Sequence, residues 1–116
     1  MKITNKIDEV ITEAKSMKQR AKRGYSDVDM WNLDEYIARI VKECCFILAE
    51  ECHGHPNHLT EKKWKQILLD ISFGFGSYLE MRSGVYDTKE VEFNRLKKEY
   101  KKGLKIFADN HQYLWD

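Results

Sequence analysis

Apolar residues recur at helical spacing in four long stretches of this chain, and that pattern constrains the fold more than any other feature. Intervals of three and four residues place apolar side chains on one face of an α-helix. The 116 residues contain one proline and six glycines, too few for the many turns of an all-β fold. The sequence therefore predicts an all-α protein.

The first predicted helix covers about residues 4–23 and carries a heptad stripe. Strict alternation of four- and three-residue steps is typical of helices that pair along a narrow seam. Small residues at Ala14 and Ala21 also suit pairing between two chains, so we expect a homo-oligomer. Gly24 then ends the helix in a left-handed conformation. The stripe consists of Ile3, Ile7, Val10, Ala14, Met17 and Ala21.

A short helical turn over residues 26–31 is expected next, because Ser26 and Asp29 have the spacing of a capping box. Asn32 is the predicted cap of a second long helix that ends near His53, before Gly54. We expect this helix to be the most buried one. Its predicted buried face holds Leu33, Ile37, Ile40, Val41, Cys44, Ile47 and Leu48, with Cys45 as a further small core residue.

The third helix is predicted from the cap Thr60 to about Met81. Gly74 and Gly76 lie inside it, where each glycine costs about 1 kcal/mol relative to alanine, so a kink or the close approach of another backbone or ligand is expected. The third stripe is Trp64, Ile67, Leu68, Ile71, Phe75, Tyr78 and Leu79. A fourth helix follows a cap at Asp87 or Thr88, and its stripe is Phe93, Leu96, Tyr100, Leu104 and Phe107.

Together these elements predict a four-helix-bundle-like single domain over residues 1–116, with a short helical turn between its first two helices. The apolar tail after residue 110 is expected to fold back on the bundle or to meet a second subunit. No apolar run approaches the roughly 20 residues that span a bilayer. With three closely spaced cysteines and no signal-peptide pattern, we expect a cytoplasmic protein without a disulfide framework or membrane partner.

The stretch from residue 23 to residue 36 is the most distinctive in the chain. It begins with Arg23-Gly24-Tyr25-Ser26-Asp27 and continues through Trp31 to Leu33-Asp34-Glu35-Tyr36. This run resembles a signature of small phage- and prophage-encoded helical proteins of unassigned activity. The resemblance extends over about residues 23–80 and implies a phage context and a helical fold, without implying a reaction.

Capping accounts for the acids of this stretch but not for its arginines and aromatic residues. Trp and Tyr rings with arginines are the usual anchors of binding surfaces. A small anionic ligand or an acidic patch on a host protein would suit this mixture of charge and ring surface. The predicted ligand- or partner-binding residues are Arg20, Arg23, Tyr25, Trp31 and Tyr36.

Two groups of residues contain the side chains of a metal site. The first consists of Asp27, Asp29, Asp34 and Glu35 and begins like a calcium loop, but the glycine and the closing glutamate of that loop are missing. The other set has zinc-ligand chemistry but matches no common zinc spacing. Its members are Cys52, His53, His55 and His58. We predict no resident metal or cofactor, and the Glu-x-x-Glu pairs of helical nucleotide pyrophosphohydrolases are absent from the sequence.

Three functional hypotheses follow. The first is a phage-type, non-catalytic interaction protein that binds a host factor or a small nucleotide-like signal, including a role against host defence. The second is a nucleic-acid-binding accessory protein that uses two lysine-rich helix faces, although the net charge is only +1. The third is a metal-dependent hydrolase that uses the histidine loop or the acids.

Overall fold

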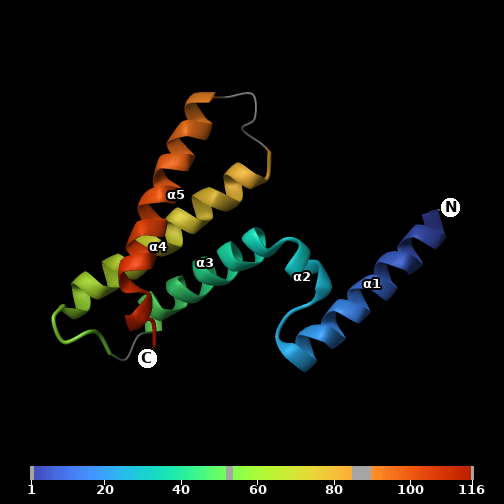
Figure 1. The fold of residues 1–116 in the computed structure, drawn as a ribbon, viewed down its shortest axis with the longest axis horizontal. Helices are drawn as coiled ribbons and strands as arrows, with labels where there is room; N and C mark the ends of the chain where they lie inside the picture. The colour runs from blue at the N-terminus through green and yellow to red at the C-terminus, as the bar shows by residue number, and fades with distance from the viewer. Residues whose placement is uncertain (1, 52–53, 85–89, 116) are drawn as a thin grey trace. The chain divides into compact units, whose positions relative to one another are not determined.

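The fold is all helical, as a computed structural model of the chain shows (Figure 1). The structure describes residues 2–51, 54–84 and 90–115. Within those ranges there is no strand, so the all-α prediction is confirmed. The bundle arrangement and the oligomeric state stay predictions. The helices are α1 (Lys2–Arg23), α2 (Asp27–Trp31), α3 (Leu33–Glu51), α4 (Glu61–Arg82), α5 (Glu90–Asn110) and the 3-10 turn η1 (His111–Tyr113).

The chain divides into two compact units, here called the N-terminal unit (Met1–Tyr36) and the C-terminal unit (Ile37–Asp116). The N-terminal unit contains α1, α2 and the first turn of α3. Gly24 has a φ of +87° directly after α1, which fulfils the predicted left-handed helix stop. Ser26 and Asp29 form the predicted capping box at the start of α2.

The core of the C-terminal unit lies between α3, α4 and α5. The third predicted stripe forms its centre, because Trp64, Leu68, Ile71 and Phe75 are all buried. Thr60 caps α4 as predicted, with its hydroxyl accepting from the backbone N–H of Lys63. Two aromatic rings of α5 pack edge to face on Phe75, so α5 covers this part of the stripe.

The buried face of α3 differs from the prediction. Its fully buried residues are Ala38, Cys45 and Ala49, whereas Cys44 and Ile47 are exposed. Small side chains let α3 approach α4 closely, and close packing gains dispersion contacts that larger residues would prevent. The placement of Cys44 in the core was therefore wrong, and so was the prediction that this helix is the most buried. The prediction for Cys45 is confirmed, and its burial raises the thiol pKa to about 11.

The helices α4 and α5 cross at two glycines. An ideal Cβ built on Gly74 would lie 2.6 Å from Cα of Gly103, a distance that real Cβ atoms do not occupy. Gly74 is thus explained by the approach of another backbone, one of the two reasons that its sequence position indicated, and Gly103 is its partner in the crossing. At Gly76 no other backbone comes this close, because an added Cβ would meet only the side chain of Lys42, at 3.5 Å.

The C-terminal tail folds back within its own unit. Tyr113 and Leu114 pack against the core, as the sequence indicated, but the side chain of Trp115 is 80% exposed. The predicted caps Asp87 and Thr88 and the predicted helix end at His53 lie outside the described residues. In the described part of the chain, none of the helices has both the length and the apolarity that a bilayer span requires.

Candidate functional site

The connection between α1 and α2, residues 24–26, is here called the turn, and it is built around the carboxylate of Asp29. Arg20 donates two hydrogen bonds to it, from Nε to Oδ2 and from Nη2 to Oδ1, each 2.8 Å long. The backbone N–H of Ser26 donates to Oδ2 at 2.9 Å, and the N–H of Asp29 donates to Oγ of Ser26 at 3.1 Å. With the Asp29 side chain only 3% exposed, this network fixes α2 against α1.

These contacts lower the pKa of Asp29 well below its usual range. The largest cause is the pair of hydrogen bonds from Arg20, and the hydrogen bonds from Ser26 act in the same direction. Desolvation raises the pKa but is the smaller effect. The Asp29 carboxylate therefore stays ionised at any ordinary pH, and it accepts hydrogen bonds from both Arg20 and Ser26.

Asp27 closes the other side of the same turn. Gln19 and Asp27 exchange two hydrogen bonds, of 2.9 Å to the Asp27 carboxylate and 2.8 Å from the Asp27 backbone N–H. Arg23 donates from Nη2 to Oδ1 of Asp27 at 2.6 Å. The bond from Gln19, followed by that from Arg23, lowers the pKa of this carboxyl group. Each arginine at the turn is thus paired with one aspartate.

An apolar depression of about 360 Å³, here called the turn groove, opens beside this polar network. The guanidinium of Arg23 stacks over the Tyr25 ring at 4.5 Å from the ring centre, and its Nε donates to the Tyr25 carbonyl at 2.9 Å. The hydroxyl of Tyr36 donates to the Gly24 carbonyl at 2.7 Å, which ties the start of α3 to the turn. The groove is lined by Arg23, Gly24, Tyr25, Met30, Leu33 and Tyr36.

The structure brings together three of the five predicted binding residues. Arg23, Tyr25 and Tyr36 line the turn groove. Arg20 does not line it, because its guanidinium is bound to Asp29. Trp31 does not line it either and projects from the end of α2 with 71% of its surface exposed.

Sequence reasoning missed two groove residues, Met30 and Leu33. Met30 is 50% exposed, and Leu33, which the sequence assigned to a buried stripe, is 51% exposed. The available signal was their position, since both flank the helix boundary at Asn32, where α2 stops and α3 starts. A second missed feature is the pairing of arginines before the glycine with aspartates after it.

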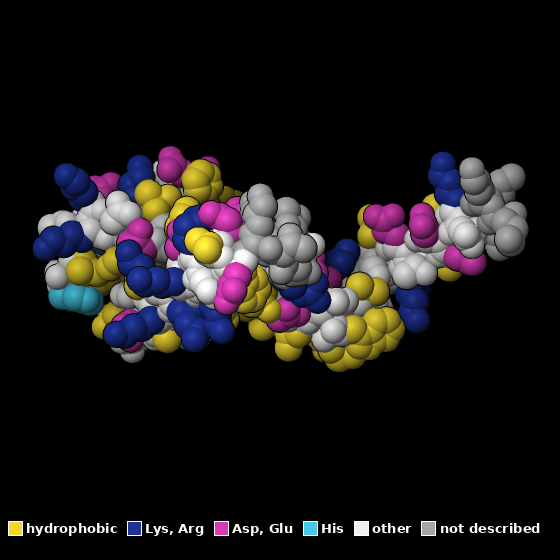
Figure 2. Space-filling view, turned by 90° about the horizontal axis from the view of Figure 1, so that it is seen from above, with side chains coloured by type: hydrophobic (Ala, Val, Ile, Leu, Met, Phe, Trp, Pro, Cys, Tyr) yellow, Lys and Arg dark blue, Asp and Glu magenta, His cyan; other side chains and the backbone are white. Residues whose placement is uncertain are grey.

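Charge is therefore largely cancelled at the turn while apolar surface is displayed. Tyr25, Met30, Trp31 and Leu33 all count as exposed although their side chains are large and hydrophobic. Figure 2 shows such hydrophobic side chains gathered on the surface of the N-terminal unit. A surface of this composition favours a partner that offers apolar contacts over one recognised by its negative charge.

The predicted histidine set is described only in part, because Cys52 and His53 lie outside the described residues. Nδ1 of the exposed His55 lies 2.9 Å from the Pro56 carbonyl, and the exposed His58 ring lies 5.2 Å from the ring of Tyr113. Among the residues that the structure describes, no three His, Cys, Asp or Glu side chains are grouped so that they could hold a metal ion.

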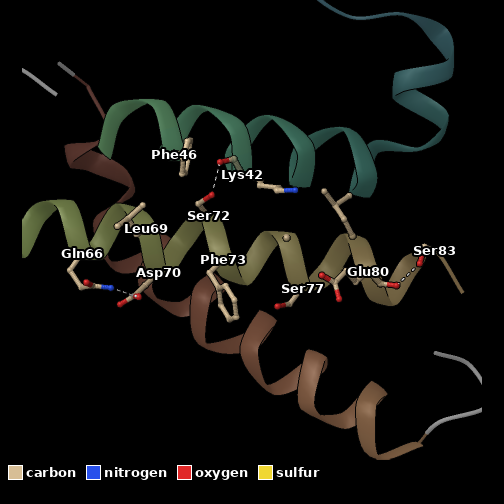
Figure 3. Close-up of a pocket in the computed structure, with 12 residues that line it drawn as sticks. Lys42, Phe46, Gln66, Leu69, Asp70, Ser72, Phe73, Ser77, Glu80 and Ser83 are labelled. Atoms are coloured by element: carbon tan, nitrogen blue, oxygen red, sulfur yellow. Dashed lines mark hydrogen bonds between the residues drawn. The ribbon is translucent and has the colours of Figure 1, made fainter. Parts of the chain in front are cut away.

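A larger open groove of about 710 Å³ lies along α3 and α4 in the C-terminal unit (Figure 3). Phe46 projects from α3 and Phe73 from α4, and both are more than half exposed. The hydroxyl of Ser72 donates to the Lys42 carbonyl at 2.8 Å and joins the two helices. Lys42, Asp70 and Glu80 give its lining mixed charge, and sequence reasoning did not identify this groove.

Comparison with known protein families, curated proteins and solved structures finds no match to this chain.

Proposed function

We propose that this chain is a phage-type, non-catalytic interaction protein that binds a host protein through its turn surface. We define the turn surface as the turn groove together with Trp31. The observation that carries the proposal is the display of large apolar side chains on a turn whose polar groups bind one another. Trp and Tyr are the residues that most often dominate binding energy in protein interfaces.

A protein partner is better supported than a small anionic ligand. An anion recognised at this turn would need guanidinium groups free to face it. Arg20 already makes a two-point contact with Asp29, and Arg23 is paired with Asp27 and stacked on Tyr25. A nucleotide-like ligand would have to displace a carboxylate from one of these arginines.

The phage context and the role against host defence rest on the signature resemblance of residues 23–36. The structure divides the signature into two groups. Gly24, Ser26 and Asp29 build the turn by backbone conformation and hydrogen bonding. Tyr25 and Trp31 are displayed by it. A signature that specifies both a turn and the rings it presents is consistent with selection for binding.

The test is affinity capture from a bacterial host lysate with the wild-type chain and matched tryptophan variants. Trp31→Ala removes a displayed ring of the turn surface. Trp115→Ala removes a ring of similar exposure, 80% against 71%, from the C-terminal unit and is the control. We expect one host protein to be retained by wild type and Trp115→Ala and to be lost, by at least tenfold in affinity, in Trp31→Ala.

Other outcomes of the same experiment would contradict the proposal. If Phe73→Ala lost the partner and Trp31→Ala still retained it, the binding site would be the groove along α3 and α4. A nucleotide-like molecule retained in native mass spectrometry and lost in Arg23→Ala would identify the anionic ligand instead. No retained partner in any lysate would remove the support for a host-binding role.

Nucleic-acid binding is the second candidate, and the exposure of the α5 lysines favours it. Phosphate contacts by lysines release counterions, so such binding weakens steeply with salt. Its test is fluorescence anisotropy with labelled DNA and RNA between about 50 and 200 mM salt, where a protein making several phosphate contacts loses orders of magnitude in affinity. Weak or salt-insensitive binding would reject it. The exposed lysines are Lys97, Lys98, Lys101, Lys102 and Lys105.

A further inference from the structure

The helix α1 uses its polar face, not its apolar face, to hold its own unit together. Ser16 is buried at 7% exposure, and Gln19, Arg20 and Arg23 make the hydrogen bonds to α2 described above. At 3.6 residues per turn, these positions lie on one side of the helix. The heptad stripe lies on the opposite side. Packing of α2 therefore leaves the stripe of α1 uncovered within the N-terminal unit.

The uncovered stripe is continuous over several turns of α1. Ile7 is 52% exposed, Val10 60% and Met17 63%, and Ile11 beside them is 62% exposed. A contiguous apolar surface of this kind on a single chain indicates an interaction site. Because the stripe has heptad spacing along one helix, its natural partner is another helix.

The charges that flank the stripe indicate which helix that is. In heptad letters, Ile7, Ala14 and Ala21 occupy a positions and Val10 and Met17 occupy d positions, which makes Glu13 a g residue and Lys18 an e residue. In a parallel, in-register pair, g of one helix faces the next e of the other. Glu13 of each copy then faces Lys18 of the other copy, so the dimer contains this pair of opposite charges twice.

The opposite orientation is disfavoured by the same residues. In an antiparallel pair over this stripe, g residues face g residues. Glu13 would then face Glu13 of the second copy, and Lys6 would face Arg20. The stripe and its flanking charges are thus self-complementary in the parallel arrangement, and a foreign helix is not needed to satisfy them.

We propose that α1 pairs with α1 of a second copy, in parallel and in register, along the stripe Ile7, Val10, Ala14, Met17 and Ala21. About two heptads form a short coiled coil, so the dimer dissociates on dilution. A parallel pair brings both turns to one end of the coiled coil. If the turn surface binds a host protein, as proposed above, the dimer presents it twice and gains avidity; the pairing itself does not depend on that function.

The first experiment measures the mass of the full chain by analytical ultracentrifugation over a range of concentrations. Val10→Glu puts a charge into the stripe, and Thr12→Glu puts the same charge at an exposed position on the opposite face. We expect a concentration-dependent dimer for wild type and for Thr12→Glu. We expect Val10→Glu to raise the dimer dissociation constant by at least tenfold.

The second experiment tests orientation with the stripe left intact. Glu13→Lys and Lys18→Glu each place like charges across a parallel dimer and should weaken it, whereas the double exchange should restore it. In an antiparallel dimer, Glu13→Lys replaces one like-charge contact by another, so the dimer dissociation constant should change little. Because these variants keep every stripe residue, they decide the question even if Val10→Glu lowers the helix content seen by circular dichroism.

Three results would overturn the pairing. The first is a wild-type chain that stays monomeric at every concentration. The second is equal weakening of the dimer by Val10→Glu and Thr12→Glu. The third is a double exchange of Glu13 and Lys18 that fails to recover the dimer lost in the single variants. A monomer whose thermal stability falls in Val10→Glu would instead assign the stripe to a contact within the chain.

Discussion

The two units of this chain are built on opposite principles. In the C-terminal unit Leu68, Ile71 and Leu96 are almost completely buried, and apolar contact joins the helices. Among the residues of the N-terminal unit whose burial the structure describes, the buried side chains are Ser16, Ser26 and Asp29, while the large apolar ones are exposed. A core of the first kind stabilises a fold. A polar network that displays apolar surface is suited to binding something else.

The largest expected difference in the free energy of unfolding comes from truncating one apolar side chain in each unit. Leu68→Ala should cost about 2–5 kcal/mol in the free energy of unfolding, because it leaves a cavity in a closed core. Trp31→Ala removes a larger but exposed side chain and should change stability by less than about 0.5 kcal/mol. Urea denaturation followed by circular dichroism measures both. A large loss in Trp31→Ala would show that its ring is packed rather than displayed.

The next test concerns close packing in the C-terminal unit. Gly74→Ala introduces a Cβ that meets the backbone of α5, and overpacking of this kind costs about 1–3 kcal/mol. Gly76→Ala is its control two residues away, because the added Cβ would lie 3.5 Å from the flexible side chain of Lys42. It should be neutral or stabilising by up to about 1 kcal/mol through helix propensity. Equal effects of the two variants would contradict the tight crossing.

A smaller effect is expected from the cap of the N-terminal turn. Ser26→Ala removes the hydroxyl that accepts from the Asp29 backbone N–H and should cost about 1 kcal/mol. Ser26→Gly should cost less, because glycine tolerates the cap conformation. Thermal unfolding monitored by circular dichroism reports the difference. If Ser26→Ala left stability unchanged, the polar network would not hold the turn.

The last test is the response of the turn to acid. Because the native pKa of Asp29 is lower than its unfolded value, the stabilisation is complete above about pH 4. It is lost as pH falls through the lowered native value. Carbon-detected NMR titration should find Asp29 ionised where exposed aspartates are already protonated. A carboxyl group that titrates near pH 4 would refute the Arg20 contact.

Sequence predicted the parts of the fold that local chemistry decides. The α4 stripe and its Thr60 cap were predictable because one face of that helix is apolar and the others are polar. The left-handed Gly24 and the Ser26 capping box were predictable because each depends on a few neighbouring residues. The Gly74 position was flagged because glycine inside a helix needs a reason.

The remaining features depend on contacts between distant residues. On α3 both the isoleucine face and the alanine–cysteine face are apolar, and only the fit against α4 decides that Ala38 and Cys45 are buried. In the turn, capping is a sufficient local explanation for Asp29, and the sequence assigns Arg20 to ligand or partner binding, so the contact between them was not evident. That contact pairs the Arg20 guanidinium with a carboxylate nine residues away, which no local pattern indicates.

A fixed polar network holds the turn while the apolar side chains of the turn stay exposed. Native-state amide hydrogen exchange at neutral pH tests it most directly, at the N–H of Ser26 that donates to Asp29. We predict slow exchange of this amide in the wild-type chain and fast exchange in Arg20→Ala, with the amides of α4 equally protected in both. Fast exchange of the Ser26 amide in the wild-type chain would contradict the account.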